Sequence, residues 1–284
     1  MRTETVRSGE VALRVARHGD GRQPAVLFVN AVGMENALLA GLGEHLRTHG
    51  LDLVTWELRG SPGADGPPRA TLEDHTADAL AVLRALDISR AHVAGWCTGA
   101  SIGLFVTHAL GTRALSFTSV DGALLFTGTP GARLGNAVFD MCAKISADRD
   151  RAGFYHDAVR PRGNESAVLG VRDEDLTRML TRPYRQDVEA LTRFAYGIHA
   201  TCDYDPVAAC ARLRVPSLFV AREDDEMVSH RHTRRAAALV AGAELSVLPV
   251  GGHYALFTDP AGAAGTMAAF MHGAVARPAG TPVR

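Results

Sequence analysis

Three side chains in this 284-residue sequence could together carry out nucleophilic acyl transfer: Cys97, Asp225 and His253. A cysteine can attack a carbonyl carbon, a histidine can take up and return the proton, and an aspartate can orient the histidine. The three residues follow one another in the order nucleophile, acid and histidine, which is one of the chain orders known for such triads. We therefore expect Cys97 to be the nucleophile, His253 the general base and then acid, and Asp225 the orienting group.

Cys97 lies in the segment Gly95-Trp96-Cys97-Thr98-Gly99, between an apolar run and a segment typical of a helix. A Gly-x-nucleophile-x-Gly turn holds the nucleophile in a strained conformation, and its small flanking residues let the strand and the helix pack closely. The alternative is that Cys97 is a small buried hydrophobic residue, as most free cysteines are. The rest of the chain has to decide between the two interpretations.

The sequence holds 12 histidines, and His253 differs from most of them because it stands in a Gly-Gly-His loop directly after the last expected strand. Loops at strand ends carry functional residues disproportionately often. Asp225 follows the strand that ends near Ala221, but the adjacent Asp224 is an alternative, since one residue of loop slack would exchange the two. Asp121, at the end of an earlier strand, is a third candidate for the acid.

A reaction of this kind also needs two hydrogen-bond donors aimed at the developing oxyanion. We expect these donors to be the backbone N–H groups of Thr98, directly after the nucleophile, and of Val32, in the first strand-to-helix loop. Asn30, Met34 and Trp96 are expected to line the substrate pocket, with plain packing as the alternative for each.

Apolar runs and helical patterns alternate on both sides of Cys97, which predicts βαβ units and a mostly parallel twisted sheet flanked by helices. Ligands bind beyond the carboxyl ends of the strands in such sheets, and Asn30, Glu57, Cys97 and Asp121 all fall at those ends. The alternating segments are strands at 11–15, 25–29, 51–56 and 114–120, a further strand in the apolar run that leads to Gly95, and helices at 35–49, 71–86 and 98–110.

The pattern changes between residues 125 and 213, where helical pieces alternate with polar loops and no clear strand is seen. We interpret this segment as a helical lid inserted into the sheet domain, where it would select and enclose the substrate. The predicted division is therefore a first core part at 1–124, the lid at 125–213, a second core part at 214–276 and a flexible tail at 277–284.

The composition excludes several classes of protein. The formal net charge is -1 with mixed signs, which gives no support for a nucleic-acid or membrane partner. The charged residues 1–7 predict no signal peptide, and no run is apolar enough for a membrane span. The four cysteines lack Cys-x-x-Cys spacing, so we expect no zinc site or redox dithiol, and a cytoplasmic location would preserve a free thiol. No motif predicts a metal or other cofactor.

Taken together, these segments resemble the α/β-hydrolase fold over nearly the whole chain, from about Val11 to Met271. The matching pieces are Val26-Leu27-Phe28-Val29-Asn30-Ala31, Glu57-Leu58-Arg59-Gly60, Gly95-Trp96-Cys97-Thr98-Gly99, Asp224-Asp225-Glu226-Met227-Val228 and Gly252-His253. Members of this family often have His-Gly where this chain has Asn30-Ala31, Asp where it has Glu57, and Ser where it has Cys97. The cysteine makes the chain similar to dienelactone-hydrolase-like enzymes and to some thioesterases and acyltransferases.

An acyl group on Cys97 would keep much of the energy of a thioester substrate, so it could still be passed to an amine or an alcohol. A thiolate is a poor nucleophile for unactivated amides and alkyl esters, whose leaving groups depart less easily. We therefore predict acyl transfer or thioester hydrolysis on a small acyl substrate carried by an acyl carrier protein or coenzyme A, and the resemblance implies a role in natural-product biosynthesis.

Two alternatives remain open. The first is hydrolysis of a small lactone or enol ester, as the similarity to dienelactone hydrolases implies. It ranks behind the thioester reaction because the long insertion favours a larger substrate. The second is a catalytically silent protein that uses the same fold to bind a ligand, since fold alone does not determine function.

Overall fold

The computed structural model describes residues 1–61, 63–159 and 165–276. Within these residues, an eight-stranded sheet has the strand order β1-β2-β4-β3-β5-β6-β7-β8. The pairs β1–β2 and β2–β4 are antiparallel and all other neighbours are parallel, so the prediction of a mostly parallel sheet is confirmed. The strands are β1 (Arg2–Ser8), β2 (Val11–His18), β3 (Ala25–Val29), β4 (Asp52–Trp56), β5 (Ala91–Trp96), β6 (Ala114–Val120), β7 (Ser217–Arg222) and β8 (Glu244–Leu248).

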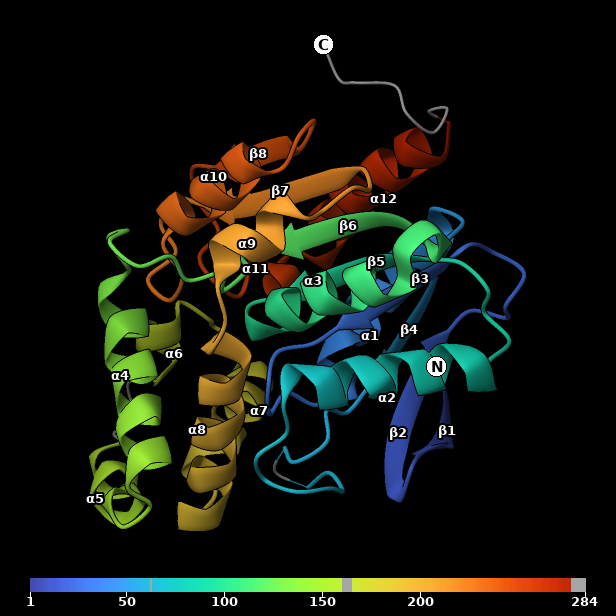
Figure 1. Ribbon diagram of the computed structural model, residues 1–284. Helices are drawn as coiled ribbons and strands as arrows, with labels where there is room; N and C mark the ends of the chain where they lie inside the picture. The colour runs from blue at the N-terminus through green and yellow to red at the C-terminus, as the bar shows by residue number, and fades with distance from the viewer. Residues whose placement is uncertain (62, 160–164, 277–284) are drawn as a thin grey trace.

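Helices cover both faces of this sheet, as the alternating sequence pattern predicts (Figure 1). Along β3, Leu27 and Val29 join the core beneath α2 and α3, whereas Val26 and Phe28 join the core beneath α1 and α12. Successive side chains of a strand point to opposite faces, so a strand that is apolar throughout serves both cores. One face carries α2 (Leu72–Ala85), α3 (Thr98–Leu110), α9 (Pro206–Ala211) and α10 (His230–Leu239), and the other carries α1 (Ala40–Thr48), α11 (Ala255–Thr258) and α12 (Pro260–Ala276).

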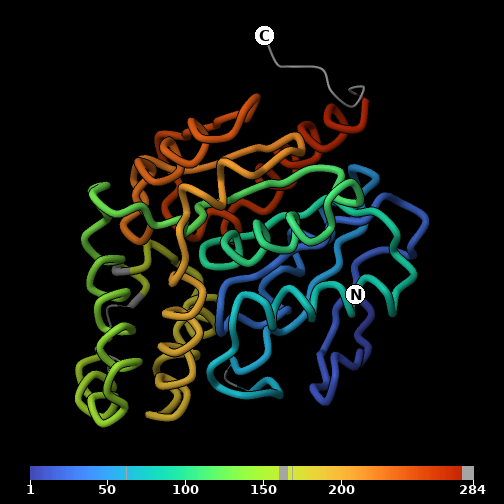
Figure 2. The backbone as a smooth tube through the Cα atoms, viewed as in Figure 1, coloured from blue at the N-terminus to red at the C-terminus, as the bar shows by residue number. Residues whose placement is uncertain are grey.

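A group of helices stands between β6 and β7 in the chain and at one side of the sheet in space (Figures 1 and 2). In this group, α8 packs against α4, α5 and α7, and it also contacts α3 of the sheet domain. No strand occurs in the described part of residues 125–213. The helices are α4 (Arg133–Ala147), α5 (Arg151–Ala158), α6 (Glu165–Leu169), α7 (Glu174–Arg185) and α8 (Val188–Cys202), and we call them the helical insertion.

The structure departs from the predicted elements in a few places. Strand β1 is not predicted, because it is an edge strand in which only Val6 and Ser8 are buried and its charged residues hide the alternation. The helix expected over 35–49 begins instead as a 3₁₀ helix at Asn36–Leu39, and α1 follows it. The flexible tail predicted for residues 277–284 lies outside the described residues.

The order of the strands brings two loops together at the carboxyl edge of the sheet. After β3 the chain moves to β4 on one side and then crosses to β5 on the other side of β3. This reversal is the switch point at which parallel sheets of this kind bind ligands. The loop that begins at Asn30 and the turn at Cys97 therefore lie side by side.

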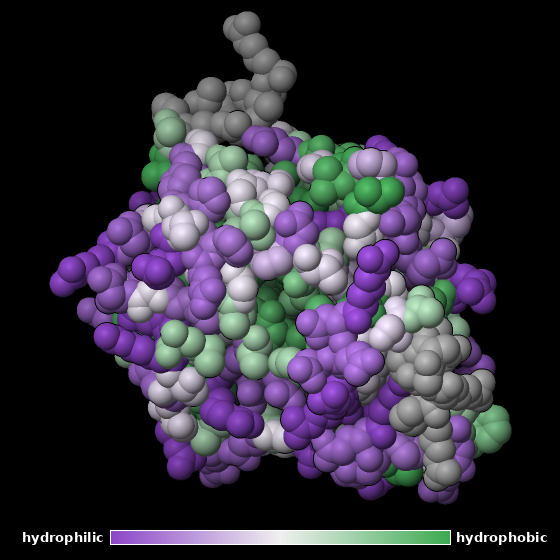
Figure 3. Space-filling view, turned by 180° about the vertical axis from the view of Figure 1, so that it is seen from behind, coloured by the Kyte–Doolittle hydropathy of each residue, from purple (hydrophilic) through white to green (hydrophobic). Residues whose placement is uncertain are grey.

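The surface seen from behind is mostly hydrophilic, with hydrophobic residues in small groups and in a recess near the middle of the view (Figure 3). Among the described residues, no helix combines the length and the apolar character needed to cross a membrane.

Candidate active site

Cys97 occupies the sharp turn between β5 and α3 that the sequence predicts. Its φ is 52°, a left-handed conformation that residues other than glycine seldom adopt. Steric constraints require both flanking glycines. A Cβ on Gly95 would collide with the backbone carbonyl of Gly99, and a Cβ on Gly99 would collide with the backbone carbonyl of Val29. The Cys97 N–H donates to Val120 O at 3.2 Å, which ties the turn to the end of β6. The thiol is thus held at the carboxyl edge of the sheet by backbone geometry.

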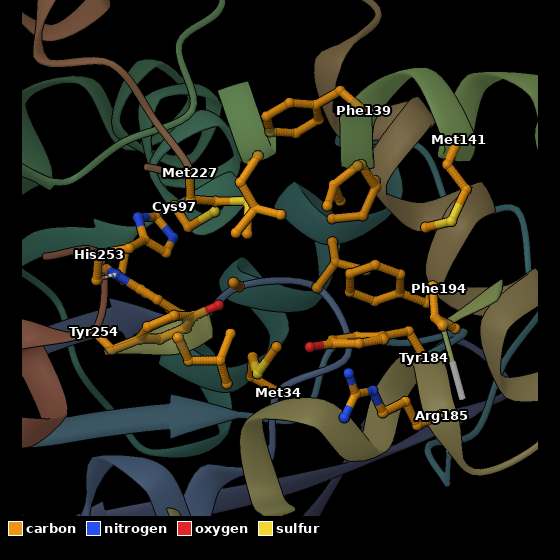
Figure 4. A pocket seen from close by; sticks show the side chains of 18 of the residues that line it. Met34, Cys97, Phe139, Met141, Tyr184, Arg185, Phe194, Met227, His253 and Tyr254 are labelled. Atoms are coloured by element: carbon orange, nitrogen blue, oxygen red, sulfur yellow. Dashed lines mark hydrogen bonds between the residues drawn. The ribbon is translucent and has the colours of Figure 1, made fainter. Parts of the chain in front are cut away.

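His253 and Asp225 reach Cys97 from loops that follow β8 and β7. The Nδ1 of His253 lies 2.8 Å from Oδ2 of Asp225, and the same imidazole is hydrogen-bonded to Cys97. The second carboxylate oxygen of Asp225 accepts the backbone N–H groups of Met227 and Val228 at 2.7 and 2.8 Å. Cys97, Asp225 and His253 are each at most 7% exposed. Figure 4 shows the thiol and the imidazole next to each other at one side of a pocket.

The charge around His253 favours its protonated form. Burial alone would lower the pKa of this imidazole, but the Asp225 carboxylate and then Cys97 outweigh burial and hold the pKa well above its usual value. A histidine that is readily protonated is the partner that a thiolate needs. The electrostatics therefore favour a protonated imidazole beside Cys97.

The structure separates the three candidate acids. Asp224 does not face His253; it accepts the N–H groups of Gly251 and Gly252 at 3.0 and 2.9 Å and so fixes the loop on which His253 stands. Asp121 forms a buried ion pair with Arg222 instead. Burial raises the pKa of Asp121 to about 7, although the Arg222 guanidinium opposes the shift. Asp225 is thus the carboxylate that contacts the histidine.

The two residues expected to stabilise the oxyanion also meet, but in an arrangement that the sequence does not reveal. Thr98 is the first residue of α3, directly after Cys97. The N–H of Val32 already donates to the side-chain oxygen of Thr98, at 3.0 Å and in a buried position. The Val32 amide is therefore engaged by a neighbouring hydroxyl and is not directed freely at the pocket.

Of the three residues expected to line the pocket, Met34 and Trp96 do so and Asn30 does not. The Asn30 side chain turns into its own loop, where its NH₂ donates to Glu35 O at 3.2 Å and its oxygen accepts the Ala31 N–H at 3.0 Å. A short amide side chain can satisfy nearby backbone groups locally, which accounts for this orientation. The two hydrogen bonds of Asn30 fix the conformation of the loop after β3.

Trp96 has a second role beside lining the pocket. Its indole N–H donates to the backbone carbonyl of His253 at 3.1 Å, and its ring centroid lies 4.9 Å from that of the imidazole. Trp96 therefore contacts His253 through both its indole N–H and its ring.

The pocket above Cys97 has a volume of about 420 Å³ and is mainly apolar. Many of its walls come from the helical insertion, which the sequence does not predict residue by residue, because a helix face that lines a pocket has the same periodicity as one that packs in a core. Tyr184 and Arg185 lie at the side opposite to Cys97 and His253 (Figure 4). The insertion contributes Leu134, Val138, Phe139, Met141, Ala158, Val159, Leu169, Tyr184, Arg185, Phe194 and Ile198.

A metal centre does not emerge from the described residues, in which no three or more His, Cys, Asp and Glu side chains are grouped so that they could hold an ion.

Comparison with known proteins agrees with this architecture. A family model described as "Alpha/beta hydrolase family" matches residues 26–266. A curated relative named "Putative carbamate hydrolase RutD", from Pseudomonas savastanoi pv. phaseolicola (strain 1448A / Race 6), is 36% identical over 63 residues. These residues make up 22% of this chain and 24% of the relative, so the match spans about a quarter of that protein.

Two solved structures are similar over most of the chain. An enol-lactonase from Burkholderia xenovorans LB400 has a TM-score of 0.75 and 19% identity, and covers 95% of this chain and 100% of its own. A hydrolase from Pseudomonas aeruginosa PA01 has a TM-score of 0.74 and 20% identity, covering 95% and 98%. At these identities the similarity establishes the fold alone.

Proposed function

The chain belongs to the alpha/beta hydrolase family, and on that premise we propose that it hydrolyses a lactone or an enol ester through an acyl-thioester intermediate on Cys97. The observation that carries this proposal is the buried hydrogen-bonded series of Cys97, His253 and Asp225 at the base of an apolar pocket. A thiol, an imidazole and a carboxylate in hydrogen-bond contact are the groups that covalent acyl transfer needs as nucleophile, proton carrier and orienting acid, which supports the proposal.

In the acylation step, the Cys97 sulfur attacks the ester carbonyl carbon while His253 holds the thiol proton. The C–S bond forms, and the carbonyl electron pair moves onto oxygen to give a tetrahedral oxyanion. When the oxyanion collapses, the C–O bond to the leaving group breaks, and His253 returns its proton to the departing oxygen. In a lactone, the leaving oxygen stays attached to the acyl group through the opened ring.

In the deacylation step, His253 takes a proton from a water molecule, whose oxygen attacks the acyl-thioester carbon. A second oxyanion forms and collapses, the C–S bond breaks, and the carboxylic acid is released. The proton held by His253 then returns to sulfur. Asp225 stays ionised throughout and stabilises the charged imidazole that forms in both steps.

An activated leaving group suits this nucleophile better than an alkoxide does. Thiolate leaves more easily than an alkoxide, so the tetrahedral intermediate of a simple alkyl ester would mostly expel sulfur and return to substrate. An enolate is a much weaker base and leaves readily. Enol esters and strained or activated lactones therefore match Cys97, and the name of one similar structure, an enol-lactonase, supports the same class of substrate.

The long helical insertion, which on sequence alone favours a large thioester substrate, has another use in the structure. The insertion supplies much of the wall of a pocket of about 420 Å³, a size that fits a small molecule. Its residues are thus used to enclose the site. Thioester hydrolysis or transfer from coenzyme A or a carrier protein remains a prediction in second place, and silent ligand binding is third.

The test is to incubate the protein with isopropenyl esters, lactones, ethyl esters and N-acetylcysteamine thioesters, and to measure acid release together with intact protein mass. We expect turnover of the enol esters or lactones well above that of the ethyl esters, with a transient acyl adduct. The Cys97→Ala variant should show neither adduct nor turnover. Turnover of thioesters alone would favour the second prediction, and an adduct on neither class would overturn the proposed mechanism.

A further inference from the structure

The loop that should supply the second oxyanion donor has its amides already engaged. The Val32 N–H donates to the Thr98 side-chain oxygen at 3.0 Å, and both residues are at most 2% exposed. The neighbouring N–H groups of Ala31 and Gly33 also donate to side-chain oxygens, at 3.0 and 3.1 Å. An oxyanion formed above Cys97 would thus find the Val32 amide covered by a hydroxyl.

We propose that the Thr98 hydroxyl itself donates the second hydrogen bond to the oxyanion, with the Val32 amide supporting it from behind. This inference rests on the proposed function, because it concerns the transition state of that reaction. Thr98 would then donate two hydrogen bonds to the oxyanion, one from its backbone N–H and one from its side-chain hydroxyl.

The geometry supports a donor rather than a blocking group. The hydroxyl oxygen uses a lone pair to accept the Val32 N–H, which leaves its hydrogen free to rotate about the Cβ–Oγ1 bond. Within the described residues, that hydrogen donates to no protein acceptor. The hydroxyl belongs to the residue directly after Cys97 and contacts the backbone N–H of Val32, which is itself a pocket-lining residue.

The arrangement also strengthens the hydroxyl as a donor. A hydroxyl that accepts a hydrogen bond is polarised and donates the next one more strongly. Both partners are buried, and a fixed donor in a site without water stabilises a developing negative charge more than the same donor in water does. The series N–H to O–H to oxyanion would therefore carry the stabilisation that a direct Val32 contact would otherwise supply.

The experiment compares two reactions of Cys97 in the full-length protein, of which only one forms an oxyanion. Acylation by p-nitrophenyl acetate passes through a tetrahedral oxyanion, whereas alkylation by iodoacetamide does not. Thr98→Val keeps the shape of the side chain and removes the hydroxyl, and Thr98→Ser keeps the hydroxyl. Both rates are followed by intact mass, with the p-nitrophenolate burst as a second readout for acylation.

We expect Thr98→Val to slow acylation by about 10²-fold, the loss typical of one oxyanion donor, while alkylation changes by less than about threefold. Thr98→Ser should restore acylation to near the wild-type rate. Unchanged or faster acylation in Thr98→Val would overturn the inference and make the hydroxyl a blocking group. Equal losses in both reactions would also overturn it, because they would indicate a structural role. Wild-type protein that is alkylated but never acylated would overturn the proposed function itself.

Discussion

The loops that carry Cys97, His253 and Asp225, called the catalytic loops after their proposed role, meet the helical insertion at one pocket. The two regions are built on different principles. In the loops, each functional group is fixed by directional contacts: Cys97 by a strained backbone, His253 by Asp225 and Trp96, and Asp225 by two backbone N–H groups. The walls from the insertion are mainly apolar side chains held by packing. On the proposed function, the reaction would therefore depend on a few directional contacts, and the choice of substrate on the shape of an apolar wall.

Removal of the proposed nucleophile should give the largest effect, because turnover depends on it directly. Cys97→Ala should lower turnover by on the order of 10⁴-fold or more, because members of a catalytic triad act as one unit. The thermal midpoint should change little, since only one sulfur atom is removed from the edge of a pocket. Turnover and melting are measured on the same samples, and retained turnover would rule out covalent catalysis by Cys97.

Two adjacent acids provide a sharper test within the same loop. Asp225→Asn should lower turnover by about 10³- to 10⁴-fold, because the amide no longer supports the imidazolium or its tautomer. Asp224→Asn should cost no more than about tenfold, since the amide oxygen can still accept one of the two glycine N–H groups. The measurement is the rate with an enol ester for both variants.

A reversal of this order, with Asp224→Asn the more damaging change, would mean that the loop and not the carboxylate–imidazole contact limits the reaction. The variants differ by one position in the chain and by nothing in side-chain chemistry, so each serves as the control for the other.

The sequence predicts which residues meet in the catalytic loops, because the features that bring them together are local or follow from the sheet topology. The spacing of Gly95, Cys97 and Gly99 records a steric requirement of the turn, and the parallel sheet brings distant loops to one edge. The choice of Asp225 over Asp224 needs coordinates, because adjacent loop residues can exchange places by a small change of backbone.

The pocket is less predictable for a physical reason. Asn30 turns away from it to bond its own loop, and the Val32 amide is taken by Thr98, both of which depend on the conformation of a short irregular segment. Phe139 and Phe194 lie on helices whose apolar stripes look like those of any core helix. Shape complementarity between helices arises only in the packed chain. It therefore gives pocket-lining residues no characteristic spacing in the sequence.

A buried charge beneath the catalytic loops should make a part of the stability depend on pH. Burial raises the pKa of Asp121 to about 7, above the value of 3.8 for a free carboxyl, despite the Arg222 guanidinium. The folded state then binds the extra proton between these values, so this group contributes stability that falls as pH rises through the window.

Asp121→Asn should remove that contribution, so the free energy of unfolding of the variant should fall less, or rise more, than that of the wild type between pH 4.5 and 7. Urea denaturation at several pH values measures the difference. His75 and His92 titrate in the same range, since burial lowers the pKa of each to about 4, and they cancel in the comparison of the two proteins. Parallel pH curves would show that Asp121 is ionised throughout.

The smallest effect is expected from the insertion, where a wall residue can be removed without touching the reacting atoms. Phe139→Ala should raise KM for short acyl groups by about tenfold through lost apolar contact, and change kcat by less than about threefold. Esters with longer acyl chains should lose less, because they fill the enlarged space. Phe154→Ala, on the neighbouring helix but 73% exposed, is the matched control and should alter neither constant. A fall in kcat with KM unchanged would instead mean that Phe139 helps to position the reacting atoms. The apolar wall would then contribute to the reaction itself, as the catalytic loops do.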